Sequence, residues 1–281
     1  MRAGICAAWP RRSAQLARAV LVALSSILLA QCSVAAGGRA DSQTISDVEL
    51  TWLNARIVLP RNGRLFHYRM DDPRVAGWKS VQWQGPVVLY LHGCTGLGNA
   101  DEEVMDLVAS QGALVIAPDS FARRGRPLQC NQKEQTGGQN LFVYAFRQAE
   151  ISFALQKIVY APWIRSGPKI LFGVSEGGVA AALYRGMAFS GRVIAQWTCH
   201  GDPLVAGISA PADEPLLTIV QSEDPWYETD KSKGQAGDCS TFFNGRPNAR
   251  SLVLHDGEKH NVFTNSEARN AVAEFLSGFR N

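Results

Sequence analysis

The stretch Lys169-Ile-Leu-Phe-Gly-Val-Ser-Glu-Gly-Gly178 decides how this chain folds. Its apolar first half predicts a buried strand, and the alanine-rich residues 179–183 that follow favour a helix. Between them lies the pattern G-x-S-x-G, in which a sharp turn holds a serine, here Ser175, in a strained conformation with its hydroxyl exposed. Gly173 and Gly177 flank it because side chains there would collide with the neighbouring strand and helix. The stretch predicts an α/β fold and a candidate nucleophile.

Apolar runs alternate with helical patterns along the rest of the chain. Strands that alternate with helices imply a mostly parallel, doubly wound sheet with helices on both faces. We expect strands at residues 86–91, 113–117, 192–197, 216–220 and 251–254, and helices at residues 100–111, 141–160 and 266–279.

An antiparallel hairpin is expected ahead of this parallel sheet. Residues 49–60 and 64–70 alternate in strand fashion around Arg61-Asn62-Gly63. Asn-Gly between two such runs is a strong hairpin signal.

A serine hydroxyl is a poor nucleophile at neutral pH, so Ser175 needs a base and a carboxylate that orients that base. When the serine lies in such a turn, the acid and then the histidine follow it along the chain. Asp224 follows the strand at residues 216–220 and is the expected acid, with its neighbour Glu223 as the rival.

His260 is the expected base, because it lies on a loop a few residues past the last strand. His255 is still at the end of that strand, and His200 precedes the acid, which is the wrong order. The sequence therefore predicts the catalytic residues Ser175, Asp224 and His260.

Acyl transfer also needs hydrogen-bond donors for the oxyanion that develops on the substrate. One expected donor is the backbone N–H of Glu176, directly after the candidate nucleophile. The other is the N–H of Cys94 in the loop after the strand at residues 86–91, where Gly93 lets the backbone approach the substrate.

Together these residues resemble the dienelactone hydrolase family of α/β hydrolases over about residues 50–280. The matching segments are Tyr90-Leu-His-Gly-Cys-Thr-Gly-Leu97, Val115-Ile-Ala-Pro-Asp119, Gly173-Val-Ser-Glu-Gly-Gly178, Asp224 and His260-Asn-Val-Phe263. The resemblance implies an α/β-hydrolase fold without a cofactor. Family members have a cysteine at the position of Ser175, so this chain fits a general carboxylic-ester or lactone hydrolase better than an enzyme for cyclic enol-lactones.

The substrate is less well defined by the sequence. Arg123, Arg124 and Arg126 lie in a long loop at residues 122–140 and are candidates for binding a substrate carboxylate, although a solvated basic loop has the same pattern. Trp226, next to the expected acid, is a candidate for lining the pocket.

The composition limits the classes of function. With 281 residues, 46% of them hydrophobic and 19% charged, the chain is neither disordered nor typical of nucleic-acid-binding proteins. The net charge of +3 comes from four arginines in residues 1–36, since without them 24 basic residues face 25 acidic ones. We therefore expect a small-molecule partner and no nucleic acid.

The N-terminus predicts export. Residues 1–36 combine arginines, a short apolar run and a small-residue end, as in a signal peptide. Leu29-Ala30-Gln31-Cys32 resembles a lipobox, so a lipid anchor at Cys32 competes with cleavage after Ala35 or Ala36. Residues 37–47 are expected to form a flexible leader and residues 48–281 a single domain, in the periplasm or outside the cell.

Four cysteines remain in the expected exported part, namely Cys94, Cys130, Cys199 and Cys239. An even number in an oxidising compartment favours disulfides, and three pairings are possible. We favour Cys94–Cys130 with Cys199–Cys239, and the spacing predicts no metal site.

The sequence thus predicts an exported serine hydrolase for esters or lactones. A peptidase or an acyltransferase with the same triad, or a binding protein that keeps the fold without catalysis, are the alternatives. The natural substrate and the oligomeric state stay open.

Overall fold

A computed structural model describes residues 45–78, 81–126, 130, 131, 134, 141–201, 205–227 and 237–280. The expected signal peptide, Cys32 and most of the expected leader lie outside these residues, as does much of the loop at residues 122–140. Residues Ile45–Asn281 form one compact unit.

Among the described residues, eight strands form one sheet in the order β2-β1-β4-β3-β5-β6-β7-β8. The strands β3 to β8 pair in parallel, and β1 pairs antiparallel with both β2 and β4. The expected mostly parallel sheet is confirmed. The strands are β1 (Arg56–Arg61), β2 (Arg64–Arg69), β3 (Val87–Leu91), β4 (Leu114–Ala117), β5 (Lys169–Val174), β6 (Gly191–Ala195), β7 (Leu216–Gln221) and β8 (Ala249–Leu254).

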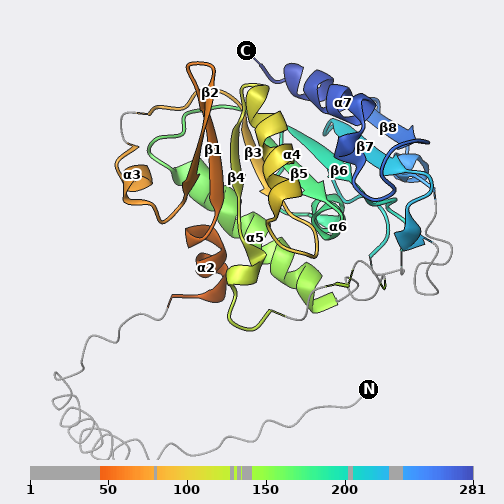
Figure 1. Cartoon of the computed structure of the whole chain (residues 1–281), viewed down its shortest axis with the longest axis horizontal. Helices are drawn as coiled ribbons and strands as arrows, with labels where there is room; N and C mark the ends of the chain where they lie inside the picture. Colours follow the sequence, from red (N-terminus) through yellow and green to blue (C-terminus); the bar gives the residue numbers. More distant parts are fainter. Residues whose placement is uncertain are drawn as a thin grey trace, which may run out of the picture. The chain divides into compact units, whose positions relative to one another are not determined.

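Helices cover both faces of the sheet, as Figure 1 shows. Helices α4 and α7 pack on one face, and α2, α5 and α6 on the other. The helices are α2 (Asp47–Leu53), α3 (Pro73–Ala76), α4 (Asn99–Ser110), α5 (Leu141–Tyr160), α6 (Glu176–Leu183) and α7 (Ser266–Ser277). Short 3-10 turns lie at η2 (Ser120–Ala122), η3 (Pro225–Tyr227), η4 (Cys239–Phe242) and η5 (Val262–Thr264).

The core follows from the alternation of side chains along each buried strand. In β3, Val88 and Tyr90 face α4 and α7, whereas Val87, Leu89 and Leu91 face the opposite layer. Both faces are covered, so β3 is apolar throughout, which is typical of a central parallel strand.

The N-terminal hairpin is confirmed, but its first strand is shorter than expected. Asn62 and Gly63 both have positive φ, 52° and 70°, as the tight turn between β1 and β2 requires. The prediction of a strand from residue 49 is wrong, because Asp47–Leu53 is the helix α2. The Ser46 side chain caps this helix by accepting the N–H of Glu49 at 3.3 Å.

Burial of Trp52 explains why the segment is helical. Its side chain packs against α5 in the core, with only 8% of the residue exposed. Tertiary packing of this one aromatic outweighs the strand-like alternation that the local sequence shows.

Two disulfides join the expected cysteines, Cys94 to Cys130 and Cys199 to Cys239. The favoured pairing is confirmed. Both bonds are typical of proteins in oxidising compartments. No helix within the described ranges is long and apolar enough to cross a bilayer.

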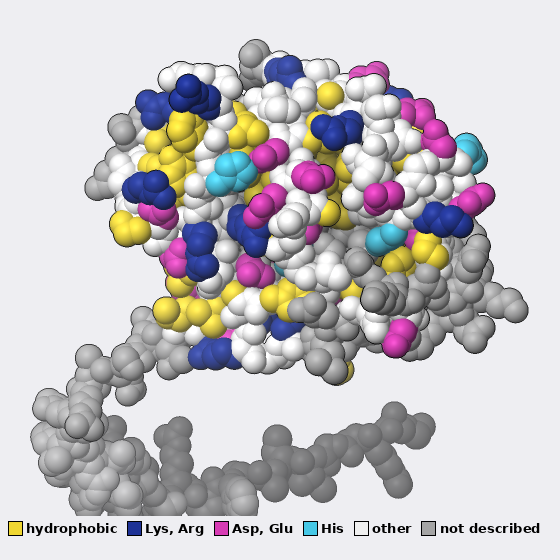
Figure 2. Space-filling model, viewed as in Figure 1, with side chains coloured by type: hydrophobic (Ala, Val, Ile, Leu, Met, Phe, Trp, Pro, Cys, Tyr) yellow, Lys and Arg dark blue, Asp and Glu magenta, His cyan; other side chains and the backbone are white. Residues whose placement is uncertain are grey.

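On the molecular face shown in Figure 2, basic and acidic side chains are interspersed. This distribution agrees with the near balance of charges outside the N-terminal 36 residues.

Candidate active site

Ser175 occupies the turn between β5 and α6 with φ 56° and ψ −117°, a strained conformation for a residue with a side chain. Its N–H donates to the carbonyl of Ala195 at 2.9 Å, which holds the turn on the neighbouring strand. A Cβ at Gly173 would lie 2.1 Å from the carbonyl oxygen of Gly177, and one at Gly177 would lie 2.1 Å from that of Leu91. Only glycine fits at either position.

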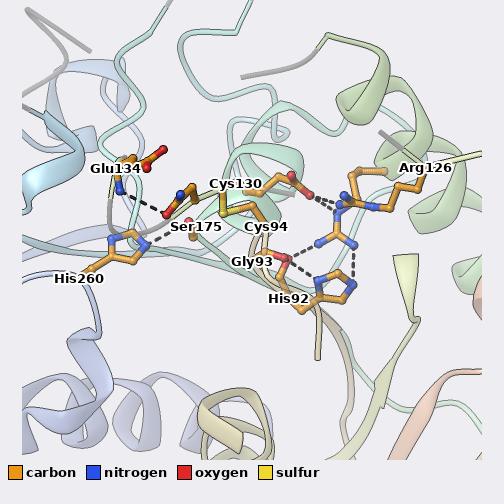
Figure 3. Close-up of a disulfide and its surroundings, with 11 residues drawn as sticks. His92, Gly93, Cys94, Arg126, Cys130, Glu134, Ser175 and His260 are labelled. Carbon is orange, nitrogen blue, oxygen red and sulfur yellow. Dashed lines mark hydrogen bonds and ion pairs between the residues drawn. A yellow bond between two sulfur atoms is a disulfide. The ribbon is translucent and has the colours of Figure 1, made fainter. Parts of the chain in front are cut away.

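Three side chains predicted from the sequence meet at this turn. His260 Nε2 lies 3.2 Å from Ser175 Oγ, and His260 Nδ1 lies 2.6 Å from Asp224 Oδ2. Figure 3 shows the imidazole directed toward Ser175. Since a carboxylate accepts at Nδ1, that nitrogen carries the proton and Nε2 is free to accept the serine proton.

The structure distinguishes Asp224 from its rival Glu223. Asp224 is 1% exposed, and its Oδ1 accepts the N–H of Trp226 at 3.0 Å, which fixes the carboxylate. The side chain of Glu223 is 65% exposed and lies 3.6 Å from Lys259 Nζ. Asp224 alone of the two contacts His260 in the structure.

The other two candidate histidines lie elsewhere. His255 is exposed, with Nδ1 at 3.1 Å from Ser222 Oγ. His200 Nε2 lies 3.2 Å from the carbonyl of Asp238, and its ring packs on Phe242. Among the described contacts, neither ring reaches Ser175 or Asp224.

The loop after β3 approaches the serine closely. A Cβ added at Gly93 would lie 3.4 Å from Ser175 Cβ, so the backbone of this loop passes directly beside the candidate nucleophile. Neither Cys94 N nor Glu176 N donates to any hydrogen-bond acceptor in the described part of the chain. Both amides therefore remain candidate donors, and Cys94 also lines the cavity at Ser175.

His92 sets the direction of the Cys94 amide. His92 Nε2 accepts the N–H of Ser120 at 3.1 Å, so Nδ1 carries the proton and donates to the carbonyl of Gly93 at 2.7 Å. The Gly93–Cys94 peptide is trans, so its N–H points opposite to that carbonyl. The Cys94 N–H is thus directed away from the His92 ring, which Figure 3 shows joined to Gly93 by a dashed line.

The His92 ring is kept neutral by its surroundings. Complete burial lowers the pKa of His92 well below its usual value, and the charge of Arg147 lowers it further. Arg147 also donates to the His92 carbonyl, which fixes the strand end beneath the loop.

A buried ionic network lies beside the nucleophile turn. Glu176 Oε1 accepts from Arg126 at 2.5 Å and lies 3.6 Å from Arg147 Nε. Glu150 lies 3.3 Å from Arg147 and 2.6 Å from Arg123. Each buried charge has a partner, which is the condition under which such a network is tolerated. The Cys94–Cys130 disulfide ties the loop that contains Arg126 to the loop after β3.

His92, Arg147 and Glu150 were not predicted from the sequence as parts of the site. A signal for the last two was present, because Arg147 and Glu150 lie three residues apart in the largely apolar α5. Charged residues at that spacing contact each other on one helix face, and buried ones need partners. The partner loops, however, lie 27 to 55 residues away in sequence.

Two of the arginines that are candidates for binding a substrate carboxylate pair with carboxylates of the protein. The Arg123 side chain is 8% exposed and pairs with Glu150, and Arg124 pairs with Asp47 at 2.7 Å. Neither is among the described residues that line the cavity at Ser175. The reason is that buried or nearby carboxylates from α5 and α2 neutralise both guanidinium groups. Trp226 does line this cavity, and its ring lies 6.0 Å from that of His260.

The cavity at Ser175 has a volume of about 470 Å³, a size that suits a small ligand. Ser175, His260, Gly93, Cys94 and Trp226 all line it. The candidate nucleophile, the candidate base and the loop with a free amide thus open into one space.

No protein-family model matches the chain, and no curated protein matches it. Among solved structures, it is similar to a dienelactone hydrolase-like promiscuous phosphotriesterase from metagenomic libraries, with 15% identity, a TM-score of 0.52, and 81% of this chain and 98% of that one covered. It is also similar to a structure described as m3DLH, with 16% identity, a TM-score of 0.52, and coverage of 81% and 100%. The chain has the α/β-hydrolase fold, and the resemblance to dienelactone hydrolases is supported at the level of the fold.

Proposed function

We propose that this protein is an exported serine hydrolase that cleaves carboxylic esters or lactones through an acyl-enzyme. The observation that carries the proposal is the position of His260, whose two ring nitrogens contact Ser175 Oγ and Asp224 Oδ2. This is the arrangement that a serine nucleophile requires. The cavity at Ser175 supplies the space for a small ester.

The reaction has two steps. Ser175 Oγ attacks the ester carbonyl while His260 Nε2 takes the serine proton, and Asp224 stabilises the imidazolium. His260 then gives the proton to the leaving alcohol as the carbon–oxygen bond breaks. In the second step His260 takes a proton from water, the resulting hydroxide attacks the acyl carbon, and the acid leaves as Ser175 regains its proton.

The amides of Cys94 and Glu176 are the proposed oxyanion donors. Their availability and the approach of Gly93 to Ser175 support this role. With these two amides, the three side chains Ser175, His260 and Asp224 provide every group that the proposed reaction uses, and the reaction needs no cofactor.

Export is proposed on the pattern of residues 1–36, and the two disulfides support an oxidising compartment. A lipid anchor at Cys32 stays the alternative to free release.

The test compares the purified protein with Ser175→Ala in hydrolysis of short-chain nitrophenyl esters and in labelling by a fluorophosphonate. We expect Ser175→Ala to lose at least about 10³-fold in kcat, since the covalent step disappears. Ser222→Ala, which changes an exposed serine, is the matched control and should keep full turnover.

Two outcomes would redirect the proposal. Equal rates in both proteins, with no label on Ser175, would leave a binding protein that only keeps the fold. Labelling of Ser175 without ester turnover would favour the peptidase or acyltransferase, which share the nucleophile but differ in leaving group or acceptor.

A further inference from the structure

Asp101, in the first turn of α4, lines the same cavity as Ser175 and His260. Its Oδ1 accepts the hydroxyl of Tyr90 at 2.8 Å, and its Oδ2 accepts the N–H of Gly98 at 3.0 Å. A carboxylate has about four acceptor positions, so about two are unused. Asp101 is not among the residues predicted from the sequence.

Both partners of Asp101 are neutral. No lysine, arginine or histidine in the described ranges lies within 4.0 Å of its carboxylate, although thirteen such pairs occur elsewhere in those ranges. The nearby cations Arg56 and Arg147 are paired with Glu102 and Glu150. Within the described ranges Asp101 therefore presents to the cavity a carboxylate that has no direct ionic partner, with Arg147 and Arg56 acting on it only from a distance.

The remaining charges on the described cavity wall do not reverse this sign. Two further charged side chains of the lining, Glu258 and Lys259, are both exposed and of opposite sign, so together they add little net charge. The Lys259 side chain is 62% exposed and lies 3.6 Å from Glu223, so its charge is largely screened and shared. An anionic substrate would face unfavourable charge here, and a cationic one favourable charge.

Partial burial removes water from the Asp101 carboxylate. Burial raises the pKa of Asp101, because the charged form loses contact with water. A cation bound beside it would replace part of that lost solvation. Trp226 lines the same cavity, and the face of an indole ring attracts cations.

We propose that Asp101 determines specificity by binding a cationic group of the substrate, so that the protein prefers ammonium-bearing esters to neutral and anionic ones. This inference rests on the proposed ester hydrolysis at Ser175. It replaces the arginine contacts to a carboxylate that the sequence suggested.

The test uses substrates that differ in charge but little in shape. In the first series the alcohols of butyrate esters are choline, 3,3-dimethylbutanol and isethionate, which carry a cationic, a neutral and an anionic group on the same two-carbon spacer. In the second series the charge is on the acyl side, with nitrophenyl esters of 4-(trimethylammonio)butyrate and of its carbon isostere 5,5-dimethylhexanoate. In at least one series kcat/KM should be roughly tenfold higher for the cation than for its isostere, with isethionate the poorest alcohol.

Asp101→Asn should reduce the ratio of cation to isostere toward one in that same series. Glu103→Gln removes an equal charge from an exposed position of α4 outside the cavity and should leave the ratio unchanged. In the unmodified protein, rising ionic strength should lower the ratio, a readout that does not depend on how well the variants fold.

A ratio near one in both series, or a ratio that Asp101→Asn does not change, would overturn the inference while leaving ester hydrolysis intact. Absence of turnover on every ester, together with unlabelled Ser175, would instead overturn the proposed function.

Discussion

At the scale of single residues, the candidate site is held by groups outside the described cavity lining, such as His92. His92 is buried, faces Ser120 N–H and the Arg147 guanidinium through Nε2, and packs beside Phe121. Protonation of Nε2 would place an N–H donor against two other donors, the Ser120 N–H and the Arg147 guanidinium. Folding therefore favours the neutral form of the His92 ring, which is the form that orients the Cys94 amide.

This coupling predicts how stability depends on pH. In the unfolded chain His92 binds a proton below about pH 6.5, whereas the pKa of the folded ring is well below that value. The unfolded state then binds more protons, so the free energy of unfolding should fall as pH drops below about 6.5, by up to about 1.4 kcal/mol per pH unit.

Urea unfolding at a series of pH values between about 7.5 and 5.5 measures this slope. His92→Gln, which cannot titrate, should show a smaller slope over that interval, whereas His255→Gln at an exposed site should keep it. An identical slope in all three proteins would show that another group is responsible.

At the scale of elements, α6 is held in place by a buried arginine from the neighbouring strand. Arg192 in β6 donates to the carbonyls of Ala181 and Tyr184 at the end of α6, and its Nε lies 2.8 Å from Glu214 Oε1. A cation at a helix C-terminus satisfies carbonyls that have no partner within the helix. The helix that begins directly after Ser175 is thereby anchored at its far end.

Arg192→Met should lower the free energy of unfolding by about 3–5 kcal/mol, because it leaves the carboxylate of Glu214 buried and unpaired. Adding Glu214→Gln should restore a measurable part of the loss. The matched control is Arg250→Met, which breaks the exposed pair with Glu274 and should cost less than about 1 kcal/mol. Equal losses for the two arginines, measured by chemical unfolding, would contradict the proposed anchoring.

At the scale of the whole molecule, the two disulfides close loops of similar length but lie at different positions relative to the candidate site. Cys94–Cys130 spans 36 residues and Cys199–Cys239 spans 40, so constraint of the unfolded chain predicts a similar stabilisation of about 4 kcal/mol from each. Only the first includes a residue whose amide is a proposed oxyanion donor.

We therefore expect Cys94→Ala/Cys130→Ala and Cys199→Ala/Cys239→Ala to lower the unfolding midpoint by similar amounts. The first double variant should also lower kcat, by about tenfold or more, with a smaller change in KM, since a displaced donor acts mainly on the transition state. Nitrophenyl ester kinetics and thermal unfolding provide both readouts. Equal kcat values in the two double variants would remove the role assigned to the first disulfide.

Much of the fold was predictable because its signals are local. The run at residues 169–178 predicted strand, turn and helix, and the structure has β5, Ser175 with φ 56° and α6 there. Asn62-Gly63 likewise encodes its own turn, because few other residues adopt positive φ at low cost. Ser175, Asp224 and His260 each follow a strand of the parallel sheet, so the sequence also predicted that they lie at one edge of it. The structure brings the three side chains together there.

The tertiary structure alone decided the features that depend on distant neighbours. Residues 47–53 form a helix whose Trp52 packs in the same core cluster as α5, and Arg123 and Arg124 pair with Glu150 and Asp47. The same holds for the contact of Asp224 rather than Glu223 with His260, and for the tautomer of His92. Backbone propensities and periodicity act over a few residues, whereas burial, charge pairing and hydrogen-bond direction are defined only when segments far apart in the chain meet.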